Sequence, residues 1–166
     1  LAINPDAVIE TSTQIYTEET SSSFHLHNYD YIIDAIDTLT HKANLLIESC
    51  KTDATVFSSM GAALKMDPLR IQIAEFWKVK GCKLAAALRQ KFRKGEKPSR
   101  KFQCVYSEEM LQNKGNNKNL EESNEGGIIS SFKPHTNGTM LHITVTFGFM
   151  LASLVINDIN RKLTNS

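Results

Sequence analysis

The 166-residue chain has the length of a single domain. Its 41% apolar and 22% charged residues are close to the average of soluble globular proteins, which excludes wholesale disorder and collagen-like or coiled-coil architectures. With 19 Lys and Arg against 18 Asp and Glu, the net charge of +1 gives no global indication of nucleic-acid or anionic-membrane binding. Three cysteines and a start without the features of a signal peptide favour a cytoplasmic protein over a secreted disulfide scaffold.

The first half of the chain predicts strands that alternate with a helix. The β-branched residues 6–11 follow an Asn-Pro pair and predict a short strand, and the polar residues 17–28 predict a loop. The apolar run in residues 29–37 predicts a strand buried on both faces, and residues 54–59 predict the next strand. Between them, the apolar residues from Thr38 to Cys50 have helical spacing, so this segment is typical of a βαβ unit.

The second half adds two strands, two helices and a long polar segment. Residues 70–76 and 102–107 predict strands, and residues 82–93 predict a helix with one apolar face. Residues 112–138 are polar and predict a long loop or insert. The apolar stretch 140–156 is shorter than the ~20 residues that a membrane-spanning helix needs. It therefore predicts a buried core helix that continues to Leu163, and no membrane partner is expected.

The candidate ligand-binding residues follow the first two predicted parallel strands. Ligands of open α/β sheets bind beyond the carboxyl ends of such strands. Asp37 is there either the N-cap of the following helix or a carboxylate that faces Mg²⁺ and a nucleotide phosphate, whereas Asp34, within the strand, is interpreted as structural. The small residues Ser58, Ser59 and Gly61 would let a ligand come close, although a plain tight turn explains them as well.

Cysteines, histidines and basic residues add weaker indications. Cys50 and Cys104 fall on apolar faces and are expected in the core, whereas Cys82, beside a glycine, is expected to be exposed. The five histidines have no metal-ligand spacing. A basic segment between Arg89 and Lys101 is either a solvated helix end or a phosphate-contacting surface for RNA, with the candidate contacts Arg93, Lys94, Lys97 and Arg100.

The run from Tyr31 to Asp37, followed by Lys42 and Ala43, resembles the ThiF/MoeB/HesA superfamily of ATP-dependent adenylating enzymes, which are related to ubiquitin-activating enzymes. Asp67-Pro68 with residues 71–73, residues 84–89 and 104–108, and residues 144–149 are similar to one branch, the tRNA threonylcarbamoyladenosine dehydratases. The resemblance covers about residues 1–111 and 138–162.

The resemblance implies the fold and the cofactors. It implies an α/β protein: the second half of a Rossmann-like, mostly parallel sheet with flanking helices and a carboxyl-terminal helical extension. Residues 1–111 would form a partial adenylating domain, 112–138 a polar insert and 139–166 a helix that packs on the same domain. ATP and Mg²⁺ are the implied cofactors, with Asp37 matching the metal- and phosphate-facing aspartate. The family's glycine-rich ATP loop would lie upstream of Leu1, since no GxGxxG or P-loop motif occurs here.

The resemblance also implies an activity and partners. The intact protein is expected to adenylate the carboxylate of threonylcarbamoyladenosine on tRNA and to act as a homodimer, whereas residues 1–166 alone are not expected to turn over ATP. One alternative is adenylation of a ubiquitin-like sulfur-carrier protein, with a sulfur-relay partner. Another is a non-catalytic dimerisation or interaction module.

Overall fold

The computed structural model describes residues 4–113 and 137–165. The described part has four strands: β1 (Tyr31–Asp34), β2 (Thr55–Ser59), β3 (Ile71–Glu75) and β4 (Gln103–Ser107). Its three α-helices are α1 (Leu39–Cys50), α2 (Lys83–Lys94) and α3 (Leu141–Thr164). Most of the predicted 112–138 insert lies outside the described residues.

The strands form one sheet in the order β1-β2-β4-β3. β1 pairs with β2 and β2 with β4 in parallel, while β3 runs antiparallel to β4 at the edge. The connection from β1 through α1 to β2 is the predicted βαβ unit. The prediction of an α/β fold with a mostly parallel sheet and flanking helices is thus confirmed.

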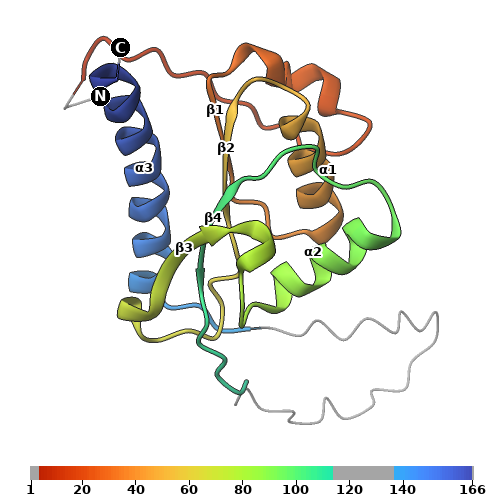
Figure 1. Cartoon of the computed structure of the whole chain (residues 1–166), viewed down its shortest axis with the longest axis vertical. Helices are drawn as coiled ribbons and strands as arrows, with labels where there is room; N and C mark the ends of the chain where they lie inside the picture. Colours follow the sequence, from red (N-terminus) through yellow and green to blue (C-terminus); the bar gives the residue numbers. More distant parts are fainter. Residues whose placement is uncertain (1–3, 114–136, 166) are drawn as a thin grey trace, which may run out of the picture.

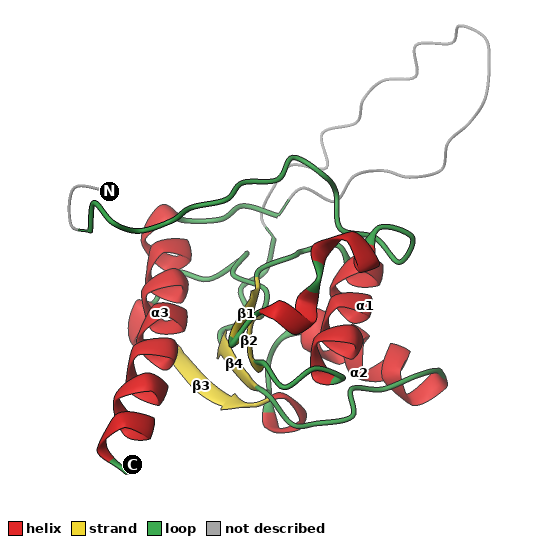
Figure 2. Ribbon diagram, turned by 90° about the horizontal axis from the view of Figure 1, so that it is seen from above, coloured by secondary structure: helices red, strands yellow, loops and turns green. Residues whose placement is uncertain are grey.

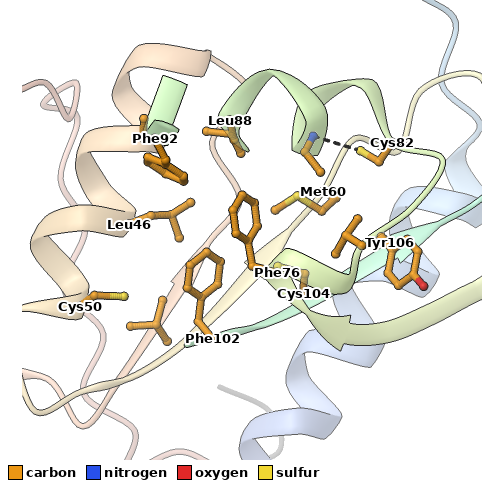
Figure 3. Close-up of a cluster of buried hydrophobic side chains, with 14 residues drawn as sticks. Leu46, Cys50, Met60, Phe76, Cys82, Leu88, Phe92, Phe102, Cys104 and Tyr106 are labelled. Carbon is orange, nitrogen blue, oxygen red and sulfur yellow. Dashed lines mark hydrogen bonds between the residues drawn. The ribbon is translucent and has the colours of Figure 1, made fainter. Parts of the chain in front are cut away.

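Helices cover both faces of the sheet (Figures 1 and 2). α1 and α2 pack on one face, where apolar side chains of both helices meet residues of β2 and β4 (Figure 3). α3 lies on the other face and contacts β2 and β4. Because both faces are covered, β4 is buried on both sides: Cys104 and Tyr106 face the α1–α2 layer and Val105 faces α3.

The amino-terminal segment differs from its prediction. Residues 7–16 have no regular secondary structure, so the strand predicted over residues 6–11 is wrong. Val8 and Ile9 are exposed by 90% and 66%. A β-branched run becomes a strand only where another strand offers hydrogen-bond partners, and the described sheet has none beside this segment.

α3 buries one face only. Ile143, Phe147 and Leu151 pack on the sheet, whereas Phe149 and Ile156 are 71% and 65% exposed. The prediction of a buried core helix is therefore correct for this face alone, because nothing in the described part of the chain covers the other. By length and composition the helix could cross a membrane, but such a helix is weak evidence for a span.

Polar contacts fix the end of α3 to β1. The Tyr31 hydroxyl donates to Asp158 Oδ2 at 2.9 Å, and Lys162 Nζ lies 2.9 Å from the same oxygen. Arg161 forms a further ion pair with this carboxylate. The hydrogen bond from Lys162, with those from Tyr31 and Arg161, lowers the pKa of Asp158 from 3.8 to about 2.

This depressed pKa predicts a pH-dependent contribution to stability. The contribution is present above the unfolded-state pKa near 4 and is lost as pH falls toward 2. Since Lys162 and Arg161 are solvent-exposed, we expect Asp158→Asn to lower the free energy of unfolding by only about 1 kcal/mol at neutral pH. Denaturant titrations at pH 6 and pH 2.5 measure this. The Asp158→Asn variant should lose less stability between pH 6 and pH 2.5 than the parent does. If it loses as much stability as the parent, or as much as the exposed-carboxylate control Asp53→Asn, the assignment is wrong.

Candidate functional site

Asp37 is exposed at the carboxyl end of β1, on the turn into α1. The N-cap of α1 is Thr38, which makes no side-chain capping hydrogen bond, so the structure does not support Asp37 as the cap. The Thr38 hydroxyl approaches Oδ1 of the Asp37 carboxylate at 3.5 Å. The carboxylate is therefore accessible to a ligand at this edge of the sheet.

A buried polar network lies beneath this turn. Lys42 and Asp34 are completely buried, with Lys42 Nζ 2.5 Å from Asp34 Oδ2. The Ser58 hydroxyl donates to the same oxygen at 2.5 Å, and the Ile36 amide donates to Oδ1 at 3.0 Å. Both carboxylate oxygens are thus hydrogen-bonded, which is the condition for keeping a charge in a protein interior. Asp34 is structural, as predicted.

The residues at the end of β2 have different surroundings. Ser58 is fully buried and its hydroxyl is occupied by Asp34. The Ser59 hydroxyl is part-buried and donates to the carbonyl oxygen of Met60 at 3.2 Å. Gly61 lines a cavity, and a Cβ at this position would meet Leu84 and Cys82 at ordinary contact distances. Of these predicted residues, Ser59 and Gly61 are partly exposed, whereas Ser58 is not.

The cavity beside Gly61 has a volume of about 600 Å³. It is formed where the chain leaves β2 and β4 and enters α2, and its lining includes Lys65, Cys82 and Glu109. Carboxyl ends of parallel strands are the usual ligand-binding edge of such sheets. The cavity and Asp37 therefore belong to the same edge.

Sequence reasoning missed two buried charged residues of this cavity. Lys65 Nζ donates to the Glu109 carbonyl oxygen at 2.6 Å, and the Glu109 carboxylate accepts from the amides of Met66 and Asp67 at 2.7 and 3.1 Å. Burial lowers the pKa of Lys65, and the two backbone hydrogen bonds lower the pKa of Glu109. No local motif marks this pair, because the two residues are 44 positions apart.

Gly81 brings the start of α2 close to the segment after β4. Its φ is +62°, and a Cβ there would lie 2.6 Å from the Glu108 carbonyl oxygen. A side chain at this position would combine an unfavourable backbone conformation with a steric clash. This close approach also explains why Cys82 is buried, at 6% exposure, rather than exposed as predicted.

All three cysteines are buried and unpaired, as the sequence predicts for Cys50 and Cys104. Burial raises the pKa of the Cys104 thiol strongly, which suppresses the nucleophilic thiolate. We expect the native protein to react with a thiol reagent such as DTNB far more slowly than the denatured protein, and Cys104→Ala to cost about 1 kcal/mol of stability. Rapid stoichiometric labelling of native Cys104, lost in Cys104→Ala and kept in Cys50→Ala, would show instead a reactive thiol.

The basic segment lies at the opposite edge of the sheet from Asp37. It comprises the carboxyl-terminal part of α2 and the chain that leads to the amino end of β4. Arg93, Lys94 and Lys97 are exposed. The guanidinium of Arg100 instead donates to backbone carbonyl oxygens, including those of Cys50 at 3.0 Å and Ala54 at 2.9 Å. The structure thus gives Arg100 a role in fixing the chain before β2.

The donor set at Asp37 fits one kind of metal ion. Among residues 4–113 and 137–165 no group of three or more His, Cys, Asp or Glu side chains could hold a metal. Mg²⁺, however, is commonly bound through one or two carboxylates together with substrate phosphates. A single accessible carboxylate therefore fits a metal that arrives with a nucleotide.

No protein-family model matches the chain. It is 41% identical over 107 residues to the tRNA threonylcarbamoyladenosine dehydratase of Bacillus subtilis, covering 64% of this chain and 42% of the relative. It is 32% identical over 168 residues to the Haemophilus influenzae protein of the same name, covering 96% of this chain and 62% of the relative.

Solved structures agree in fold. The crystal structure of Escherichia coli tRNA N6-threonylcarbamoyladenosine dehydratase in complex with ATP superposes with a TM-score of 0.78 and 24% identity, covering 99% of this chain and 62% of that one. The same protein in complex with AMP gives a TM-score of 0.75. The chain is thus, in sequence and in fold, a relative of the tRNA threonylcarbamoyladenosine dehydratases, and it spans less than two thirds of the length of these relatives.

Proposed function

We propose that the protein adenylates the carboxylate of threonylcarbamoyladenosine on tRNA and thereby drives its cyclisation. The observation that carries this proposal is the accessible carboxylate of Asp37 at the ligand-binding edge, on a turn that lies above a buried polar network. The relatives of the chain are named tRNA threonylcarbamoyladenosine dehydratases. The cavity beside the parallel strands supports this proposal, because ligands of such sheets bind at this edge.

The proposed chemistry needs a carboxylate held against a polarised phosphate. A carboxylate oxygen of the substrate forms a bond to the α-phosphorus of ATP, and pyrophosphate leaves with the electrons of the broken P–O bond. AMP then leaves with that oxygen as the side chain closes its ring, so the nucleoside loses one water overall. Bound Mg²⁺ supplies neutralisation of the phosphate charge.

Each predicted site residue has a proposed role at the carboxyl edge of the sheet. Asp37 holds the metal ion of the nucleotide, and Ser59 and Gly61 lie beside the phosphates. Ser58 acts through Asp34, since its hydroxyl is buried and donates to that carboxylate. We further propose a cytoplasmic homodimer, for which the exposed apolar side chains of α3 offer a surface.

The test is product analysis with the protein at its native length. Incubation with ATP, Mg²⁺ and tRNA that carries threonylcarbamoyladenosine should yield the nucleoside lighter by one water, with AMP and pyrophosphate in equal amounts. Pyrophosphate release that depends on a ubiquitin-like sulfur carrier and not on tRNA would favour that alternative substrate. No reaction with either substrate would favour a non-catalytic module.

The exposed part of the basic segment is the proposed tRNA contact. Replacing Arg93, Lys94 and Lys97 by Gln should weaken tRNA binding and reduce the slope of log K against log salt by about 2 to 3, since each phosphate contact releases about 0.7 to 0.9 counterions. Filter binding at several salt concentrations measures this slope. The control pair Lys78→Gln and Lys80→Gln should leave it unchanged. An unaltered slope in the triple variant would assign these residues to a solvated helix end.

A further inference from the structure

Lys42 is among the largest fully buried side chains in the described part of the chain. Lysine is rarely buried completely, because removing an ammonium group from water costs several kcal/mol even after relaxation. An apolar residue on this face of α1 would pack against the sheet without that cost. The burial of a lysine here therefore indicates that its charged ammonium group is needed as a hydrogen-bond donor.

The geometry shows what the ammonium group connects. Lys42 Nζ donates to the carbonyl oxygen of Ile36 at 3.0 Å and pairs with Asp34 Oδ2 at 2.5 Å. The Ile36 amide donates to the other oxygen of the same carboxylate at 3.0 Å. One ion pair thus holds both polar groups of the Ile36 backbone, six residues before Lys42 in the chain.

These two backbone groups set the direction of Asp37. The Ile36 amide belongs to the peptide unit between Ala35 and Ile36, and the Ile36 carbonyl belongs to the unit that joins Ile36 to Asp37. Fixing both peptide planes fixes the backbone from which the Asp37 side chain emerges. The Ser58 hydroxyl, which donates to Asp34, anchors this arrangement to β2.

We infer that Lys42 is a positioning residue that orients Asp37, through the Ile36 backbone, toward the metal ion of the bound nucleotide. This inference rests on the role of Asp37 in the proposed function. If the ion pair were only structural, replacing both residues by neutral ones of similar volume would cost little stability and would leave the orientation of Asp37 unchanged. A positioning pair loses the orientation of Asp37 in that replacement even where stability is recovered.

The first test measures the turn itself and is independent of activity. Amide hydrogen exchange of the 166-residue chain should show faster exchange at Ile36 in Lys42→Met, by about tenfold or more relative to the amides of β2. The comparison with β2 removes the effect of global destabilisation. Unchanged relative exchange at Ile36 would overturn the inference.

The second test separates orientation from stability with two variants of the native-length protein. In Lys42→Met, the Mg²⁺ concentration that gives half-maximal adenylation should rise at least tenfold, and the urea midpoint should fall. In the double variant Asp34→Asn with Lys42→Met, most of the urea midpoint should return while the raised Mg²⁺ requirement persists. A double variant that recovers both properties, or a folded Lys42→Met with the parental Mg²⁺ requirement, would show that the pair only balances charge.

The two tests keep this inference distinct from the proposed function. If Asp37→Asn leaves adenylation unchanged, the proposed role of Asp37 fails, whatever Lys42 does. If Asp37→Asn abolishes adenylation while the double variant keeps the parental Mg²⁺ requirement, the positioning role of Lys42 fails and the role of Asp37 stands.

Discussion

Replacing Asp37 by Asn is expected to reduce adenylation at least 100-fold while leaving the fold intact. The amide is nearly isosteric with the carboxylate but carries no charge to hold Mg²⁺ or to offset the phosphates. Asp37 is exposed and makes no ion pair in the described structure, so its replacement removes little native stability. ATP–pyrophosphate exchange in the presence of modified tRNA measures the activity, and circular dichroism checks the fold.

The matched control is Asp53→Asn. Asp53 is another exposed aspartate, but it precedes β2 and therefore lies at the opposite edge of the sheet. This variant should keep parental activity, which would show that the loss at position 37 does not follow from a general change of surface charge. Parental activity in Asp37→Asn would instead remove Asp37 from the proposed site.

Replacing Phe76 by Ala is expected to lower the free energy of unfolding by about 3 to 5 kcal/mol, as for large-to-small substitutions of buried aromatic residues. Phe76 is fully buried between the sheet and α2 (Figure 3). Its ring stacks on Phe102 at 5.0 Å between centroids and meets the edge of Phe92 at 5.6 Å. The loss would be a large share of the stability of a domain of this size, which is typically about 5 to 15 kcal/mol.

Urea denaturation of the 166-residue chain measures this loss of unfolding free energy. Leu69→Ala is the control, because Leu69 is 92% exposed and its truncation should change the free energy of unfolding by no more than about 0.5 kcal/mol. A Phe76→Ala variant as stable as Leu69→Ala would contradict the central place of Phe76 in the core.

Periodicity in the sequence was sufficient to predict the elements that make local amphipathic patterns. The helical spacing of Ala43, Leu46 and Cys50 predicts the buried face of α1, and alternation in residues 102–107 predicts β4. The position of Asp37 at this edge also follows from the sequence, because the turn that follows a parallel strand lies at the ligand-binding edge.

Features that depend on distant segments could not be predicted in this way. Lys42 has the sequence character of a solvated helix residue, and only the approach of Asp34 and the Ile36 carbonyl makes its burial tolerable. Arg100 belongs to a basic segment by composition, but the chain before β2 occupies its guanidinium. Cys82 is buried because Gly81 brings the start of α2 against the segment after β4.

Paramagnetic mapping tests the proposal that the metal-bound nucleotide lies at the carboxyl edge of β1 and β2. Mn²⁺ is added with ATP to the native-length protein, and the broadening of amide signals is measured by NMR. We expect the signals of Asp37, Ser59 and Gly61 to broaden first and Asp37→Asn to weaken this effect. Broadening centred on Tyr31 and Thr55, at the amino ends of the same strands, would contradict it.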